Sequence, residues 1–140
     1  MNISFFSEDV SSPKFKKRVI STWIKNVILA EGKVTGNISF IFCSDDYLLQ
    51  VNRKYLNHDF FTDIVTFDYV EGSLISGDIF ISTDRVRENA VEFNTSFENE
   101  LNRIMIHGVL HLLGFKDKNK KDKIQMSGKE DFYLNELSVG

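Results

Sequence analysis

Cysteine, proline and long apolar runs are all scarce in this 140-residue chain. Its single cysteine, Cys43, excludes an internal disulfide and fits a reducing compartment. No stretch approaches the ~18 consecutive apolar residues of a membrane-spanning helix, and the first residues lack the basic and apolar regions of a secretory signal. We therefore expect a cytoplasmic protein with no membrane partner.

The remaining composition is typical of one globular domain. Apolar residues make up 42% of the chain, which argues against extended disorder, and the length is sufficient for a self-supporting core. No repeat, low-complexity tract or linker interrupts the sequence, so we predict a single domain over residues 1–140. The net charge of −3 does not by itself indicate nucleic-acid binding, but lysines gather at 116–123 and can hold phosphates.

Apolar periodicity predicts both strands and helices. Strand-like patterns occur at residues 3–6, 38–43, 64–69 and 78–82. Helical spacing occurs at residues 13–30, 44–56, 84–92, 95–113 and 119–137. Interspersed helices and strands predict an α+β fold, a small mixed sheet covered by helices. The fourth helix is expected to lie centrally, because its periodic apolar residues leave little surface for exposure.

The starts of two of these helices carry local signals. Pro13 is placed in the first turn of the first helix, whose apolar stripe is expected to include Val19 and Trp23. Thr95, with Glu98 three residues later, fits a capping box at the start of the fourth helix.

The fourth predicted helix carries two of the three histidines, His107 and His111. Their four-residue spacing turns both rings to one side of the helix. Gly114 is placed to end the helix in the left-handed conformation, which lets the chain turn back and bring Asp117 to the rings. Two imidazoles, one carboxylate and a position open to water form the donor set of hydrolytic metal sites. We therefore predict one divalent metal, zinc, with His107, His111 and Asp117 as its ligands.

The alternative is that these histidines are ordinary polar residues, since their spacing alone is a weak signal. Their apolar neighbours favour a metal, because two imidazoles in such surroundings need polar partners and a metal satisfies both. Gly108 after His107 excludes the His-Glu-x-x-His pattern, so the usual base of zincin proteases is missing. Glu100, seven residues before His107 on the same helix face, is expected to orient a ligand ring.

Residues 107–115 follow the pattern His-Gly-x-Leu-His-Leu-x-Gly-aromatic, which resembles the signature of the YbeY family of bacterial rRNA maturation factors. Two further blocks, at residues 51–67 and 77–84, resemble that family in the same order. The resemblance implies a single-strand-specific, metal-dependent endoribonuclease that acts in rRNA maturation, including processing of the small-subunit rRNA 3′ end, and in ribosome quality control. It also implies two partners, single-stranded or ribosomal RNA and the small ribosomal subunit.

Three positions depart from the family pattern. Asp117 stands where the family usually has a third histidine; aspartate is a competent zinc ligand that shifts preference toward harder metals. The family's arginine falls on Leu56, and Arg53, one turn earlier, is a candidate substitute in substrate binding, with a solvated surface arginine as the alternative. Phe61 stands where the family usually has proline, which affects the stiffness of the loop.

The sequence assigns no catalytic residue beyond a water bound to the metal, and the attacking group is either that water or the substrate's own 2′-hydroxyl. Asp63 and Asp78 lie in the family blocks as candidate bases, although helix capping or turn stabilisation is the favoured explanation. Phe60 and Phe61 lie in a polar loop near the predicted site. They are candidates for stacking on unpaired bases, with core packing as the alternative.

Three other functions stay open on the sequence alone. The chain can be a metal hydrolase of another bond, such as a peptide. It can be a non-catalytic ribosome assembly factor whose metal is structural. It can also be a degenerate relative that binds no metal.

Overall fold

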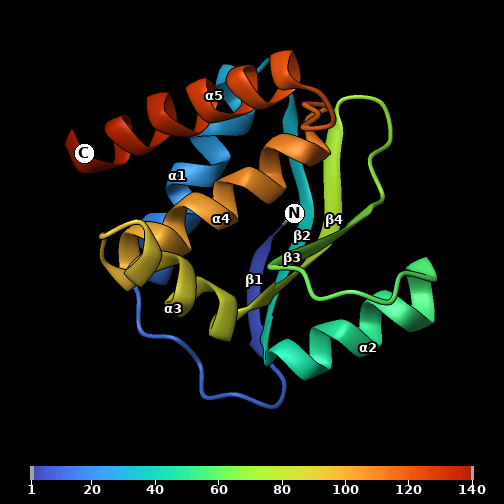
Figure 1. Cartoon of the computed structure of the whole chain (residues 1–140). Coiled ribbons are helices and arrows are strands. Elements are labelled where there is room, and N and C mark those ends of the chain that lie inside the picture. The colour runs from blue at the N-terminus through green and yellow to red at the C-terminus, as the bar shows by residue number, and fades with distance from the viewer. Residues whose placement is uncertain (1, 140) are drawn as a thin grey trace.

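Four strands and five helices account for most of residues 2–139, the part of the chain described by the structure, which is a computed structural model. The strands are β1 (Ile3–Ser7), β2 (Val34–Cys43), β3 (Ile64–Asp68) and β4 (Leu74–Ser82). The helices are α1 (Lys17–Ala30), α2 (Asp45–Leu56), α3 (Thr83–Glu92), α4 (Phe97–Leu112) and α5 (Lys120–Val139). The sheet order is β1-β2-β4-β3; β1, β2 and β4 run parallel and β3 is antiparallel to β4. This is the predicted α+β fold with a mixed sheet (Figure 1).

The two faces of the sheet carry different helices. On one face, α1 and α4 pack over side chains of β2 and β4 that include Phe40 and Ile79. On the other face, α2 buries Leu48 and Val51 against Val65 of β3. Helix α4 contacts α1, α3, α5, β3 and β4, so it lies centrally, as predicted (Figure 1).

Helix α4 lies very close to the sheet at Gly108. A Cβ atom at this position would come within 2.9 Å of Ile79 Cγ2 and 3.0 Å of Ile64 Cδ1, which is closer than carbon atoms pack. Glycine therefore permits the close approach of α4 to β3 and β4. The approach brings the neighbouring His107 close to the end of β3, where the loop from α2 enters the sheet.

Helix α5 is the longest helix, with 20 residues. Its buried residues Met126, Glu130 and Tyr133 recur at helical spacing. Trp23 Nε1 of α1 donates a hydrogen bond of 2.9 Å to the backbone carbonyl of Tyr133, which joins the two helices. Across residues 2–139, no helix combines the length and the apolar character needed to cross a bilayer.

The structure moves two predicted helix starts. Helix α1 begins at Lys17 rather than Pro13, and its buried stripe includes Ile20 and Trp23 while Val19 is 49% exposed. The cap of α4 is Ser96, whose Oγ accepts a hydrogen bond of 3.0 Å from the Asn99 amide. The neighbouring Thr95, the predicted cap, instead accepts from the Asn99 side chain at 2.8 Å. Helix α1 thus begins four residues later than predicted, whereas the cap of α4 shifts by one position.

Candidate metal centre

Helix α4 presents two histidine rings side by side on one face. The Nε2 atoms of His107 and His111 lie 3.0 Å apart, and the ring planes meet at 84°. The side chains are 21% and 27% exposed, so both rings are mostly buried but still reach solvent. The i, i+4 spacing therefore brings the two rings together as predicted.

The chain reverses directly after α4 and returns a carboxylate to these rings. Gly114 has a φ of +102°, and the Phe115 amide donates to the Leu110 carbonyl at 3.0 Å while the Gly114 amide donates to the His111 carbonyl at 3.0 Å. These are the two hydrogen bonds of a Schellman motif, which needs the left-handed residue that glycine supplies. The turn places Asp117 Oδ2 at 3.4 Å from His107 Nε2 and 3.5 Å from His111 Nε2.

Both rings are held from behind through their Nδ1 atoms. His111 Nδ1 lies 3.1 Å from the Phe115 carbonyl oxygen, and His107 Nδ1 lies 2.6 Å from Glu130 Oε2. A carbonyl oxygen and a carboxylate both accept hydrogen bonds, so each Nδ1 carries the proton and donates. In the neutral rings, each Nε2 then presents a lone pair toward the other. Two lone pairs at this distance repel unless a proton or a metal ion lies between them.

The three side chains fit a divalent metal. The ligand atoms of His107, His111 and Asp117 all lie within 4.8 Å of one another. Two nitrogen donors, one carboxylate oxygen and a solvent-facing side match the three-ligand pattern that leaves one coordination position open. The Nδ1 contacts supply the fixed ring orientation that metal-binding histidines usually show. These residues, named below as the metal cluster, can therefore hold one such ion.

Charge acts in opposite directions on the two rings. Burial disfavours the protonated form of His107, but the hydrogen bond to Glu130 and the charges of Glu130, Asp117 and Asp63 outweigh it and raise the pKa of this ring. Burial and the charge on His107 together lower the pKa of His111. The two facing rings thus favour one shared proton over two, and a metal ion would displace that proton on binding.

The carboxylate that orients His107 is Glu130, and the sequence prediction of Glu100 was wrong. Glu130 comes from α5 and is 7% exposed; its second oxygen accepts from Arg103 Nη1 at 2.9 Å. Arg103 also donates to Asp131 at 2.7 Å. Glu100 is buried too, and this burial raises its pKa, but it projects from α4 one helical turn before Arg103. A signal for Glu130 does exist, because it lies on the buried stripe of α5 between Met126 and Tyr133.

The metal cluster opens into a cavity of about 850 Å³ between α2, β3 and the end of α4. Its lining includes Asp63, whose pKa is raised by burial, and Lys118 on the far side of the turn. Leu56 and Phe60 also line it, so these two positions of the second family block lie in the same cavity as the metal cluster. Asp78 lies on β4, paired with Phe67, and does not line this cavity.

The structure leaves Arg53 outside the cavity lining. Its side chain is 54% exposed and forms an ion pair with Asp59 on the loop that follows α2. Leu56, at the position of the family arginine, lines the cavity instead. Arg53 is thus near the cavity in sequence, one turn before Leu56, but its guanidinium is engaged elsewhere.

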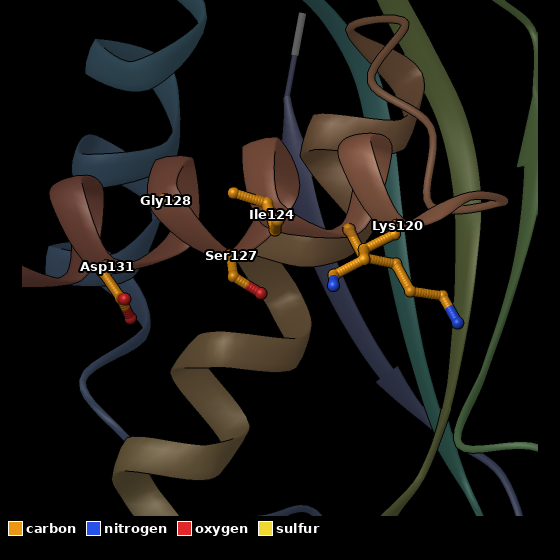
Figure 2. Close-up of a pocket in the computed structure, with 6 residues that line it drawn as sticks. Lys120, Ile124, Ser127, Gly128 and Asp131 are labelled. Carbon is orange, nitrogen blue, oxygen red and sulfur yellow. The ribbon is translucent and has the colours of Figure 1, made fainter.

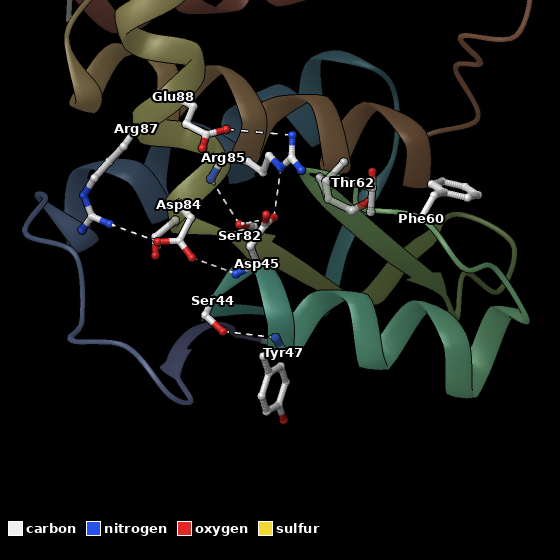
Figure 3. A network of polar contacts seen from close by, with 12 residues as sticks. Ser44, Asp45, Tyr47, Phe60, Thr62, Ser82, Asp84, Arg85, Arg87 and Glu88 are labelled. Atoms are coloured by element: carbon white, nitrogen blue, oxygen red, sulfur yellow. Dashed lines mark hydrogen bonds and ion pairs between the residues drawn. The ribbon is translucent and has the colours of Figure 1, made fainter.

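A second polar group lies where β2 and β4 end and α2 and α3 begin (Figure 3). Asp45 accepts hydrogen bonds from Arg85 Nε at 3.0 Å and from the Ser82 hydroxyl at 3.3 Å. The Asp45 amide donates to Asp84 at 2.9 Å, and Ser44 caps α2 by accepting from the Tyr47 amide at 3.1 Å. We call these residues the strand-end network: Ser44, Asp45, Ser82, Asp84 and Arg85. Each of their polar side chains meets a partner inside the protein.

The lysines after the metal cluster divide between two surfaces. Lys118 lines the cavity described above. Lys120 and Lys123 instead line a shallow hollow along α5 with Ile124, Ser127 and Asp131 (Figure 2). This hollow offers one carboxylate and no histidine, so it lacks the donors of a metal site. Its lysines extend positive charge away from the metal cluster along one side of α5.

Comparisons with known proteins agree with the resemblance at residues 107–115. The family model described as Endoribonuclease YbeY matches residues 2–138. Proteins named Endoribonuclease YbeY include one from Parabacteroides distasonis, 52% identical over 94% of this chain and 92% of its own length. Another, from Phocaeicola vulgatus, is 49% identical over 98% of this chain and 99% of its own length.

The fold is also similar to that of a solved structure. A Thermotoga maritima protein, determined in solution, superposes with a TM-score of 0.66 at 30% sequence identity. The match covers 96% of this chain and 88% of the other. The sequence match over nearly the full length and the shared fold lead to one conclusion: this chain belongs to the Endoribonuclease YbeY family.

Proposed function

We propose that residues 1–140 form one metal-dependent endoribonuclease domain, which cleaves single-stranded RNA with zinc held by His107, His111 and Asp117. One observation carries this proposal. The Nε2 atoms of the two histidines and Asp117 Oδ2 converge at one point of an open cavity, while both Nδ1 atoms are fixed from behind. Family membership supports RNA as the substrate of this site.

The donor set supports zinc as the ion. Two imidazoles and a carboxylate with an open position are typical of catalytic zinc, although the oxygen donor of Asp117 also suits harder ions such as manganese. When bound, a divalent ion neutralises charge on the phosphoryl group and makes a coordinated water more acidic. Glu130 contributes by holding the His107 ring, and the raised pKa of Asp63 lets this side chain hold a proton at the cavity wall.

Two basic side chains are the proposed phosphate ligands, Lys118 in the cavity lining and Arg53 outside it. Lys118 lines it directly and supplies a positive charge for the RNA backbone. Arg53 is the proposed substitute for the family arginine, and it reaches a phosphate only after leaving Asp59. Such exposed ion pairs are weak, typically about 0–1 kcal/mol, so an RNA phosphate can compete with Asp59 for the guanidinium. Arg53→Ala is then expected to reduce RNA cleavage while the bound metal is retained.

The cellular setting of this proposal is the cytoplasm, with maturation of ribosomal RNA on the small ribosomal subunit as the process. The scarcity of cysteine supports the location, and the one cysteine, Cys43, is a buried free thiol whose pKa is raised by burial to about 12. A thiol of this kind is structural and stays reduced. The small subunit as partner comes from the family resemblance alone, and co-sedimentation of the purified protein with small subunits tests it.

The first experiment measures metal content and RNA cleavage on the same samples. Tag-free protein is analysed by elemental mass spectrometry beside His107→Ala and Asp117→Ala, and each sample is then incubated with a short single-stranded RNA. We expect about one ion per chain in the wild type, and loss of both metal and cleavage in both variants. Asp117→His should retain the metal, because a third imidazole is an equally good ligand.

Asp46→Asn is the matched control, since Asp46 is exposed on α2 and does not line the cavity. It should keep both metal and cleavage. Metal without RNA cleavage, together with binding to small ribosomal subunits, would favour the assembly-factor alternative. Cleavage of casein rather than RNA would favour a peptidase. Protein that binds no metal after reconstitution would remove the proposal, and would leave the histidines as packing residues.

A further inference from the structure

Two aromatic rings lie stacked inside the cavity that contains the metal cluster. The ring centroids of His58 and Phe60 are 5.1 Å apart with an angle of 21° between their planes. Both residues line the cavity together with His107 and His111. Phe60 is nevertheless 56% exposed, so most of this apolar ring meets water rather than protein. Figure 3 shows the Phe60 ring projecting clear of the strand-end network.

The loop that carries this ring pair is held in place by a buried amide. Asn52 of α2 is 1% exposed, and its Nδ2 donates to the Phe60 carbonyl at 3.0 Å. The backbone carbonyl of Asn52 accepts a hydrogen bond from the His58 backbone amide at 3.1 Å. One buried residue thus fixes the backbone on both sides of Asp59. The backbone positions that carry the two rings are therefore set before any ligand arrives, which lowers the entropic cost of ordering the loop on binding.

The neighbouring Phe61 is in a different position. The guanidinium carbon of Arg85 lies 5.3 Å from the centre of the Phe61 ring, so one face of that ring is already covered by a cation. Phe61 also does not line the cavity. The two consecutive phenylalanines are therefore not equivalent. Phe60 has a free ring face in the cavity, whereas Phe61 packs against the strand-end network.

We propose that His58 and Phe60 form a stacking platform for one unpaired base of the RNA, and that this platform makes the site selective for single strands. This inference rests on the function proposed above. The flat rings match the face of a nucleobase, and aromatic side chains bind single-stranded nucleic acids by stacking on successive bases. Lys118 in the same cavity can hold the backbone phosphate. A base inside a duplex is covered on both faces and cannot occupy the platform.

The test measures binding without cleavage. Fluorescein-labelled single-stranded RNA is titrated with chelator-treated protein, and fluorescence polarisation reports the dissociation constant. Phe60→Ala should weaken binding by about 5- to 150-fold, the fold-change that corresponds to one base–aromatic stack. Phe60→Trp keeps a larger ring and should bind at least as tightly as the wild type. Blunt RNA duplex should bind the wild type and Phe60→Ala equally.

Phe132→Ala is the matched control, because Phe132 is 57% exposed but lies on α5 outside the cavity. It should bind single-stranded RNA like the wild type, and Phe61→Ala should change binding far less than Phe60→Ala. A second series uses RNAs with one abasic position each. In the wild type, one abasic position should weaken binding as much as Phe60→Ala does, and that position should have no effect in Phe60→Ala.

The outcomes separate this inference from the proposed function. Metal-dependent cleavage by a Phe60→Ala variant that binds every abasic RNA like the wild type would overturn the platform and leave the nuclease standing. Loss of binding in Phe60→Ala that is equal for every RNA, duplex included, would also overturn it, because stacking needs an unpaired base. A wild type that neither binds nor cleaves RNA would remove both proposals. Capture of a protein segment on the rings, without any RNA effect, would assign them to a protein partner instead.

Discussion

The metal cluster and the strand-end network are both groups of charged and polar side chains over the same sheet, but they differ in how they are satisfied. In the strand-end network, Asp45 meets Arg85 and Ser82, and Asp84 meets a backbone amide. In the metal cluster, the Nδ1 atoms of His107 and His111 have hydrogen-bond acceptors, while the Nε2 atoms of the two rings face each other. A closed network stabilises a fold, whereas ring nitrogens that meet only one another and a nearby carboxylate are the arrangement of a ligand site.

Removing the His111 imidazole ring is expected to have the largest effect. His111→Ala should lose essentially all retained metal, because the metal cluster keeps only one imidazole. Added zinc should then no longer raise the melting temperature, although it does so for the wild type by binding the folded state. Elemental mass spectrometry measures the retained metal, and differential scanning fluorimetry with and without zinc measures the melting temperatures.

His58→Ala is the control for that experiment. It removes the third histidine of the chain, which lines the same cavity but is not in the metal cluster. This variant should keep the full zinc response. A zinc response in His111→Ala equal to that of the wild type would mean that the convergent rings are not the ligands, and the contrast with the strand-end network would fail.

A more conservative substitution tests the Glu130 carboxylate, which contacts His107 Nδ1. Glu130→Gln keeps the shape of the side chain but removes the charge that holds His107 Nδ1. We expect metal affinity to fall by about 10- to 100-fold, the usual effect of losing an outer partner of a metal ligand. Competition with a chromogenic chelator measures this affinity.

Asp131→Asn is the matched control for Glu130→Gln. Asp131 shares Arg103 with Glu130, but its side chain is 67% exposed. Its metal affinity should stay within error of the wild type. If both variants lost affinity equally, Arg103 rather than the contact to His107 would be the important element.

A substitution in the strand-end network should lower stability and leave metal binding unchanged. Asp45→Ala leaves Arg85 Nε and the Ser82 hydroxyl without their acceptor. The unfolding free energy should fall by about 1–3 kcal/mol, the cost of such unpaired groups, while metal content stays unchanged. Glu88→Ala, which removes an exposed partner 3.9 Å from Arg85, should change stability by less than about 1 kcal/mol. Urea unfolding of the metal-loaded proteins gives both values, and metal loss in Asp45→Ala would break the comparison.

The smallest expected effect depends on pH and concerns the support of α5. Glu31 at the end of α1 accepts from Lys129 Nζ at 2.9 Å and from the Tyr133 hydroxyl, on either side of Glu130. Burial opposes the charged form, but these two partners outweigh it and lower the pKa of Glu31 below its ordinary value of 4.5. The contribution is therefore present above that value and is lost as pH falls through the lowered pKa.

Glu31→Gln tests this contribution. At neutral pH the variant should be less stable by about 1 kcal/mol, and the difference from the wild type should shrink as the solution becomes more acidic than the ordinary pKa. Urea unfolding across a pH series measures it. Metal content at neutral pH should not change. A difference that grew in acid would show that burial, rather than Lys129 and Tyr133, governs this carboxylate.

The parts of the site that are local in sequence could be predicted, and the parts that depend on packing could not. The spacing of His107 and His111 and the turn at Gly114 are set within one helix and its end, so the metal cluster followed from sequence. Glu130 could not be chosen over Glu100, because both are acidic residues on buried helix faces. Only the packing of α5 against α4 decides which of them reaches His107.

The fold shows the same division. The α+β class and the central position of α4 followed from apolar periodicity, because burial of one face is what that pattern encodes. The order β1-β2-β4-β3 did not follow, since strand pairing is fixed by contacts distant in sequence. The shift from Thr95 to Ser96 reflects two adjacent residues that can both cap a helix, of which serine is the slightly better cap.

The position of Glu130 also sets an order of events during synthesis. A ribosome makes the chain from its N-terminus, so His107 and His111 leave the exit tunnel before α5 is available. Until α5 emerges and packs, His107 lacks the carboxylate that fixes its tautomer and its ring. The nascent chain therefore carries the two facing rings without their final alignment. Alignment of the metal cluster is coupled to translation of α5, which follows both histidines along the chain.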